Sequence, residues 1–260
     1  MQPRTRTFLD IASFLLLAGC VAWLIYRSGE SMSYNWQWYR VPEFLYTVKD
    51  GSLHAGPLVK GILITLNITW ISLICTFAIG LATALLRLSD SFVGRALARG
   101  YLELIRNTPL LTQIFFIYFV LSPVLGIGRF TSAVLALSLF EGAYASEIFR
   151  AGIVSIPKGQ WEAAHSLGLS SWQTYRTVIL PQAVRRVLPP LTSIGVSLIK
   201  DSALVSTIAI YELTMQGQVI ISETFLTFEI WFTVALMYLV VTISLSLLVS
   251  RLENRFRIAA

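Results

Sequence analysis

The stretch Glu162-Ala163-Ala164-His165-Ser166-Leu167-Gly168, followed by Ile179-Leu180-Pro181, decides how this 260-residue chain is interpreted. It lies between hydrophobic segments and predicts a short amphipathic helix closed by a glycine, then a second short helix and a proline stop. Gly168 can adopt a positive φ and turn the chain sharply, whereas Pro181 restricts the residue before it. Ala163 and Ala164 give a small, flat helix face that another protein can approach closely. The alternative is an ordinary surface helix-turn-helix.

The composition indicates a membrane protein. Hydrophobic residues make up 55% of the chain and charged residues 13%, and the mean hydropathy is +0.70, whereas a soluble protein usually carries about 25% charged residues. Its apolar runs can cross a bilayer core of about 30 Å. Backbone groups in lipid need internal partners, so the spans should be helices. Because the runs do not alternate with period two, they do not fit a β-barrel, and the predicted fold class is an all-α polytopic membrane protein.

Charge and cysteine usage narrow the function further. The net charge is +6, but the basic residues cluster between apolar runs, which is typical of the positive-inside rule and not of a nucleic-acid partner. Cys20 and Cys75 both lie in apolar runs, and His54 and His165 have no ligand-like neighbours, so we expect neither disulfide nor metal site. The chain has no P-loop and no visible nucleophile–base arrangement, so we expect no catalytic residues and no ATP-binding site in it.

Six spans are predicted, at 8–26, 60–86, 109–120, 130–150, 182–206 and 226–250. A basic loop is expected at 87–101, and Pro189-Pro190 and Gly195 should interrupt the fifth span. The predicted regions are an N-terminal helix with an aromatic, extracytoplasmic interfacial segment (1–59), a transmembrane domain (60–250) whose cytoplasmic loop is 151–181, and a cytoplasmic tail (251–260). One alternative for the first span is a lipoprotein signal peptide cleaved before Cys20.

The basic residues give the orientation. Six spans place both termini on one side, together with 14 lysines and arginines, against five on the other and Lys200 near the membrane. Both termini and the loop 151–181 are therefore predicted to be cytoplasmic.

Polar residues inside the spans are candidate site residues, because an ionisable group in a membrane helix is costly and by default marks function. Glu141 lies in mid-span, Tyr144 shares its face, and Glu147 can pair with Arg150 three residues on. Glu141 is either a substrate ligand facing a water-filled cavity or a buried acid that pairs with Arg106 or Lys200. Lys200 is either a substrate-path group or a snorkelling side chain at the outer interface. Glu103 and Arg106 can pair on one helical face.

The opening stretch resembles the EAA loop of ABC-importer permeases. The tracts 103–111, 141–150 and 200–204 resemble those of permeases for polar amino acids. The resemblance covers about residues 60–250 and implies six transmembrane helices, namely the five-helix core of a type I importer plus an N-terminal helix. It implies a coupling helix that docks into the ATPase subunit through Trp161, Glu162, Ala163, Ala164, Gly168 and Pro181. The implied substrate path holds Arg106, Asn107, Thr108, Glu141, Tyr144, Glu147, Lys200 and Asp201.

The same resemblance implies the partners and the location. They are a dimer of ATPase subunits that hold ATP and magnesium, a second permease copy or paralogue, a periplasmic amino-acid-binding protein, an amino acid and membrane lipid, in the bacterial inner membrane. Two other functions remain open at this point. An ion-coupled secondary transporter would take up substrate without ATP, and an intramembrane enzyme built on Glu141 and Glu147 would cleave a substrate without any ATPase.

Overall fold

The computed structural model describes residues 11–21, 23–24, 27, 34–49 and 51–256. The chain divides into two units, residues 1–39 and 40–260, which are described separately. In the first unit, an apolar helix covers Ile11–Val21, inside the span predicted at 8–26. It is shorter than the roughly 20 residues that a span needs, and the rest of that predicted span falls mostly outside the described residues.

The second unit contains the transmembrane core. Among the residues that the structure describes, four helical stretches are long and apolar enough to cross a membrane, and a fifth span is formed if one bent pair of helices counts as one. The four are Pro57–Leu88, Arg129–Val154, Ser171–Ile208 and Thr227–Arg251, and the bent pair is Phe92–Arg106 with Leu110–Leu125. This agrees with the five-helix core expected from the sequence.

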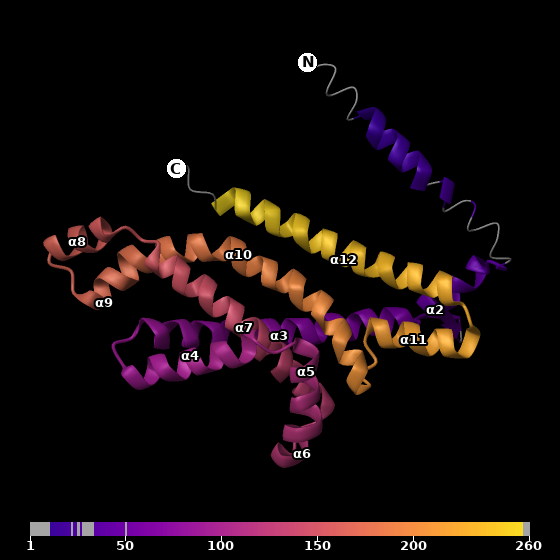
Figure 1. Ribbon diagram of the computed structural model, residues 1–260, viewed down its shortest axis with the longest axis horizontal. Coiled ribbons are helices and arrows are strands. Elements are labelled where there is room, and N and C mark those ends of the chain that lie inside the picture. Colours follow the sequence, from indigo (N-terminus) through magenta and orange to yellow (C-terminus); the bar gives the residue numbers. More distant parts are fainter. Residues whose placement is uncertain (1–10, 22, 25–26, 28–33, 50, 257–260) are drawn as a thin grey trace. The chain divides into compact units, whose positions relative to one another are not determined.

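The helices α3 (Pro57–Leu88) and α7 (Arg129–Val154) pack along each other at the centre, as Figure 1 shows. Small residues lie in their contact: Gly80 lies against Ala145 and Ser146 of α7, and Ala84 is fully buried. Small residues let helix backbones approach closely in lipid, where there is no hydrophobic force between helices.

The predicted basic loop at 87–101 is mostly helix. Only a short turn separates α3 from α4 (Phe92–Arg106), and α4 packs back against both α3 and α7. Ser91 begins the helix by accepting a hydrogen bond from the backbone N–H of Gly94 at 3.1 Å, a normal N-cap. The predicted loop is wrong because α4 alternates its arginines with a buried apolar face, which consists of Gly94, Ala98, Leu102 and Ile105.

A sharp break follows α4, where the chain bends by 108° into α5 (Leu110–Phe115), η2 (Phe116–Leu121) and α6 (Ser122–Leu125). Gln113 holds the break: its side-chain Nε2 donates to the carbonyl oxygen of Ile105 at 2.8 Å and to the backbone and hydroxyl oxygens of Thr108 at 3.1 and 2.8 Å. These bonds satisfy carbonyl groups that the end of α4 leaves without a partner. Pro109 is the N-cap residue of α5 and therefore lies at the start of the predicted third span.

The prolines of the fifth span do not interrupt it. The helices α9 (Ser171–Thr174), η3 (Tyr175–Ile179), α10 (Leu180–Asp201) and η4 (Ser202–Ile208) follow one another directly. Pro181 lies just after the wider π-helical turn η3, which is the local adjustment that absorbs the missing N–H and the ring of a proline. Pro189 and Pro190 lie inside α10. The predicted stop at Pro181 and the predicted interruption at Pro189-Pro190 are therefore wrong.

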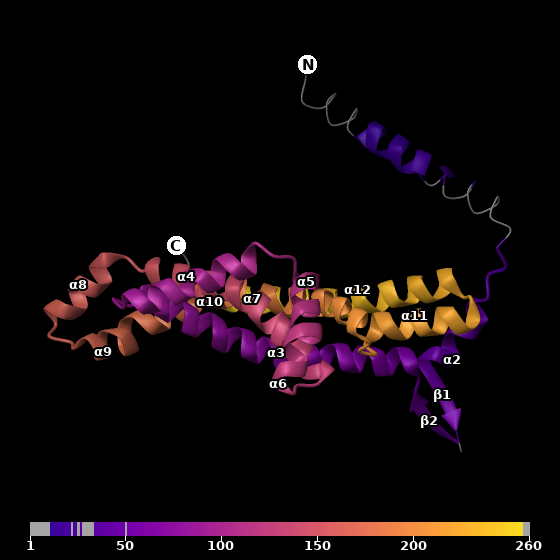
Figure 2. The same cartoon turned by 60° about the horizontal axis from the view of Figure 1, so that its bottom comes forward.

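The two ends of the second unit carry different elements (Figures 1 and 2). The helices α8 (Lys158–Ser166) and α9 lie at one end. At the other lie α11 (Leu213–Thr224), the start of α12 (Thr227–Phe256), α2 (Val41–Leu45) and the antiparallel hairpin of β1 (Tyr46–Lys49) and β2 (Ser52–Ala55), in which Tyr46 pairs with Ala55. The short helix η1 (Trp38–Arg40) lies where the chain passes from the first unit into the second. The sequence predicted an interfacial segment at 27–59 but not this hairpin.

A buried carboxylate fixes the start of α11. Glu212 is fully buried and accepts hydrogen bonds from the backbone N–H groups of Thr214 and Met215 at 2.9 and 2.8 Å and from the hydroxyl of Tyr238 at 2.8 Å. It lies between the last two spans. Burial raises the pKa of Glu212, and these hydrogen bonds oppose that shift without cancelling it.

Candidate coupling and translocation site

The turn after α8 has the geometry that the sequence predicted. Gly168 has a φ of +76°, and its N–H donates to the carbonyl oxygen of His165 at 2.9 Å, while the N–H of Leu169 donates to that of Ala164 at 3.2 Å. This pair of bonds is a Schellman motif, which ends a helix and needs a residue with positive φ at the glycine position. The chain then enters α9 through a capping box of Ser170 and Gln173.

The faces of α8 differ from the predicted ones in one respect. Ala163 is exposed, but Ala164 is 2% exposed and packs against the chain itself. The flat face therefore consists of Ala163 and its exposed neighbours. These neighbours are Glu162, His165, Ser166, Leu167 and Gly168.

An aromatic contact joins α8 to η3. Trp161 is half-buried and meets Tyr175 edge-to-face, with the ring centroids 5.0 Å apart. Trp172, by contrast, is 72% exposed, and Leu167 is 80% exposed. Both side chains therefore lie on the surface of the loop.

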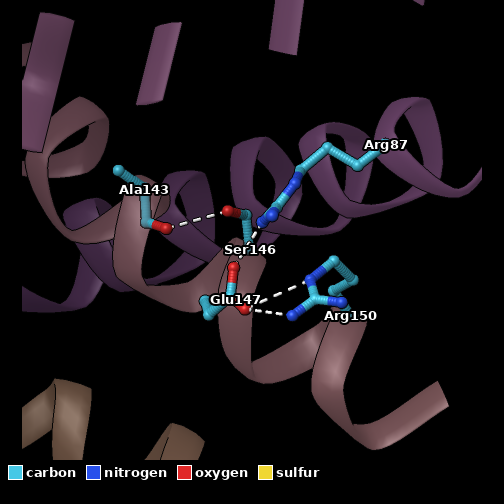
Figure 3. Close-up of polar contacts among 5 residues, drawn as sticks. All are labelled: Arg87, Ala143, Ser146, Glu147 and Arg150. Atoms are coloured by element: carbon cyan, nitrogen blue, oxygen red, sulfur yellow. Dashed lines mark hydrogen bonds and ion pairs between the residues drawn. The ribbon is translucent and has the colours of Figure 1, made fainter. Parts of the chain in front are cut away.

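Glu147 forms a clamp between α3 and α7 (Figure 3). Its carboxylate accepts hydrogen bonds from the guanidinium groups of Arg87 at the end of α3 and of Arg150 one turn further along α7. The second contact has two N–H donors, one of them Nε at 3.1 Å. The structure thus contains the Glu147–Arg150 pair allowed by the sequence, and it adds Arg87, which had been assigned to a loop.

A second charged cluster lies deeper in the bundle. Glu141 is 6% exposed. Its carboxyl group lies close enough to that of Asp201, at the end of α10, for the two acids to interact, and Lys200 lies close enough to act on both charges. Lys200 and Asp201 are not at an outer helix end, because η4 continues for seven residues beyond them. Glu141 therefore meets neighbouring charged side chains in the isolated chain.

The remaining predicted path residues gather at the end of α4. Arg106 does not pair with Glu103 as expected. Its guanidinium lies over the ring of Tyr144, 5.8 Å from the centroid, a cation–π distance. Asn107 instead donates to Glu103, at 2.7 Å to the backbone oxygen and 3.0 Å to the carboxylate. The hydroxyl of Thr108 donates to the carbonyl oxygen of Leu104 at 2.9 Å.

A cavity of about 630 Å³ connects these groups with the clamp. Five arginines line it, and four of them were not among the predicted site residues because the sequence placed them in loops or in a local pair. The lining comprises Arg87, Leu88, Arg95, Arg99, Leu102, Glu103, Arg106, Asn107 and Arg150. A helical period in 95–106 would have revealed this polar stripe. Within the described residues, no group of three or more histidine, cysteine, aspartate or glutamate side chains could hold a metal ion.

Comparison with known proteins gives consistent results. Residues 76–258 match the family described as "Binding-protein-dependent transport system inner membrane component". The chain is 43% identical over 204 residues to the glutamine transport system permease protein GlnP of Escherichia coli (strain K12), covering 77% of this chain and 93% of that protein. It is 37% identical to the nopaline transport system permease protein NocM of Agrobacterium fabrum, covering 75% and 86%.

Solved structures show the same fold. The crystal structure of an amino acid ABC transporter with histidines matches with a TM-score of 0.72 at 38% identity, covering 76% of this chain and 94% of that one. An inward-facing structure of the MetNI methionine ABC transporter matches with a TM-score of 0.63 at 21% identity, covering 77% and 96%. At that identity the second match shows the fold alone.

Proposed function

The chain belongs to the family of binding-protein-dependent transport system inner membrane components, and from that premise we propose which substrate, partners and residues its transport uses. It is a multi-pass inner-membrane permease subunit of an ATP-driven ABC importer. The proposed substrates are polar or charged amino acids. Support comes from relatives named for glutamine, cystine and nopaline transport.

The proposed partners follow from the same premise. A dimer of ATPase subunits would hold ATP and magnesium, a second copy or a paralogue of this chain would complete the pathway, and a periplasmic binding protein would deliver the amino acid. With the orientation predicted from the basic residues, the loop with α8 lies in the cytoplasm, where the ATPase would meet it. The exposed Ala163 face and Leu167 supply the contact surface.

The observation that carries this proposal is the Schellman turn at Gly168, because it presents α8 as a rigid, exposed element at one end of the core. The proposed path runs from Glu141, Lys200 and Asp201 in mid-span to Arg106 and Tyr144. Asn107 and Thr108 continue it at the break after α4, and Glu147 completes it nearer the loop. The charged groups of both signs suit a zwitterion.

Gly168→Pro tests the coupling role. Proline has a fixed φ of about −65° and no N–H, so it can neither adopt the +76° conformation nor donate to His165. We expect the complete transporter, reconstituted in proteoliposomes, to insert and assemble normally but to lose amino acid uptake that depends on ATP. Glu162→Lys should also reduce uptake by reversing a charge on the contact face.

Gly159→Ala is the matched control, because Gly159 lies in the same helix with open space around its Cα. It should transport like the unmodified protein. Full substrate-stimulated uptake by the Gly168→Pro transporter would refute the coupling role, and uptake that persists without ATP and follows an ion gradient would refute the importer as a whole.

A further inference from the structure

The arginine-lined cavity contains more arginines than the described acidic groups can neutralise. Arg87 and Arg150 share the single negative charge of the Glu147 carboxylate. Arg95 donates from Nη1 to the carbonyl oxygen of Ser89 at 2.7 Å in the turn between α3 and α4. Among the described residues, by contrast, Arg99 has no ion-pair or hydrogen-bond partner.

Arg106 is in a similar state, since its contact is the ring face of Tyr144 rather than an anion. Among the residues that the structure describes, Glu103 is the only carboxylate in the cavity lining, and it accepts from the neutral amide of Asn107 and not from an arginine. Counting Glu147 as well, five arginines face two acids. The cavity therefore presents an uncompensated field that attracts anions.

The positions along α4 give this field a pattern. Arg99, Glu103 and Arg106 are four and three residues apart, so they follow one another on a single helix face. At a rise of 1.5 Å per residue, about 10 Å of helix separates Arg99 from Arg106. Guanidinium groups bind carboxylates through paired N–H donors, and the Glu103 carboxylate between them suits an ammonium group.

We propose that this arginine-lined cavity, called the chamber below, binds an amino acid with an acidic side chain. The two carboxylates of the amino acid would bind Arg99 and Arg106, and its ammonium group would lie beside Glu103. A neutral amino acid fills only one of the two cationic positions, so the chamber favours dicarboxylic substrates. This inference rests on the proposed function, because it identifies the substrate class for the loop end of the same pathway.

The position of the chamber fits a late step of transport. Tyr144, on which Arg106 lies, follows Glu141 by three residues along α7, and Arg150 follows by nine. These separations correspond to about 4.5 and 13.5 Å along the helix. The chamber thus extends from the mid-span charges toward the end of α7 that leads into α8, and a substrate passing Glu141 would reach it next.

The test measures binding of L-glutamate, and of L-glutamine as its neutral isostere, to the purified permease–ATPase complex in nanodiscs by isothermal titration calorimetry. We expect L-glutamate to bind more tightly than L-glutamine. Arg99→Gln and Arg106→Gln should each weaken L-glutamate binding by roughly tenfold, because each removes one charge-assisted contact. Arg185→Gln is the control, since Arg185 is exposed on α10 and does not line the cavity.

Three results would overturn the inference. Equal affinity for the two amino acids, unchanged in the Arg99 and Arg106 variants, would show that the chamber does not select carboxylates. An effect that vanishes when phosphatidylglycerol is replaced by phosphatidylcholine would show that the arginines hold a lipid phosphate. Loss of subunit assembly in both variants would show that they pair with another subunit. None of these depends on ATP-driven uptake in proteoliposomes, whose absence from the unmodified transporter would instead refute the proposed function.

Discussion

Replacing Gly80 by alanine should loosen the contact between α3 and α7, on which the rest of the site depends. A Cβ atom at position 80 would lie 2.6 Å from the Cβ of Ala145 and 3.1 Å from the backbone nitrogen of Ser146. Carbon atoms in contact prefer a separation of about 3.5–4.0 Å. Neither neighbour is the end of a flexible side chain, so the two helices must move apart by about 1 Å.

The packing cost of Gly80→Ala can be separated from the gain that alanine brings through its higher helix propensity. Adding a methylene-sized group to a packed contact costs about 1–3 kcal/mol, whereas glycine to alanine inside a helix gains up to about 1 kcal/mol. Gly100→Ala on α4 provides the matched control, because nothing lies within 4 Å of the place that its Cβ would occupy and only the propensity gain applies. The difference between the two variants is therefore the packing cost alone, about 1–3 kcal/mol.

The assay heats both variants in detergent. The unfolding midpoint is the temperature at which half of the monodisperse protein is lost on size-exclusion chromatography. One kcal/mol shifts the midpoint of a chain of this size by roughly 2–4 °C, so Gly80→Ala should unfold several degrees below Gly100→Ala. Because α3 carries Arg87 toward Glu147, substrate transport should also fall. If both variants unfold at the same temperature, the close approach of α3 and α7 is not what holds them together.

Further predictions concern the charged side chains. Glu147→Gln should destabilise the permease by about 1–2 kcal/mol, a value between those of an exposed pair and a charged hydrogen bond; a double-mutant cycle with Arg87→Gln that shows no coupling would contradict the clamp. Burial raises the pKa of Glu212 above its unfolded value of about 4.3, so folding stability should fall as the pH rises from that value through the folded-state pKa. Glu212→Gln should flatten this pH dependence of stability. An unchanged pH profile in the variant would show that Glu212 does not cause the dependence. Glu141→Gln should leave assembly intact and weaken uptake or change the amino acid preference; normal kinetics across a panel of amino acids would assign Glu141 a purely structural role.

The sequence was most informative where local chemistry determines the conformation. Gly168 was predicted to take a positive φ, and it does so inside a complete Schellman motif, because few other residues can end a helix in that way. The Glu147–Arg150 pair could be predicted for a similar reason, because the two residues lie three apart and one turn of helix brings their side chains together.

Long-range contacts could not be predicted. Arg87 and Glu147 are 60 residues apart, and Glu141 and Asp201 are 60 apart as well, so only the packing of whole helices brings them together. Pro181 was misjudged because its cost depends on the neighbouring turns, and the π-helical turn η3 absorbs that cost. Propensity is a weak guide wherever tertiary packing can compensate.

The arginines that line the cavity bear on the predicted orientation as well as on the proposed binding. The predicted orientation counted 14 basic residues on one side, and five of these line the cavity. The positive-inside rule describes basic residues in loops and at helix ends. An arginine that binds a ligand is therefore weaker evidence for the orientation of the chain than an arginine in a loop. Removing those five leaves nine against five, so the same side remains the more basic and the predicted orientation stands with a smaller margin. A tag on the last residue that is protected from protease in sealed inside-out vesicles would contradict it, and would also place the chamber at the entrance of the pathway rather than at its exit.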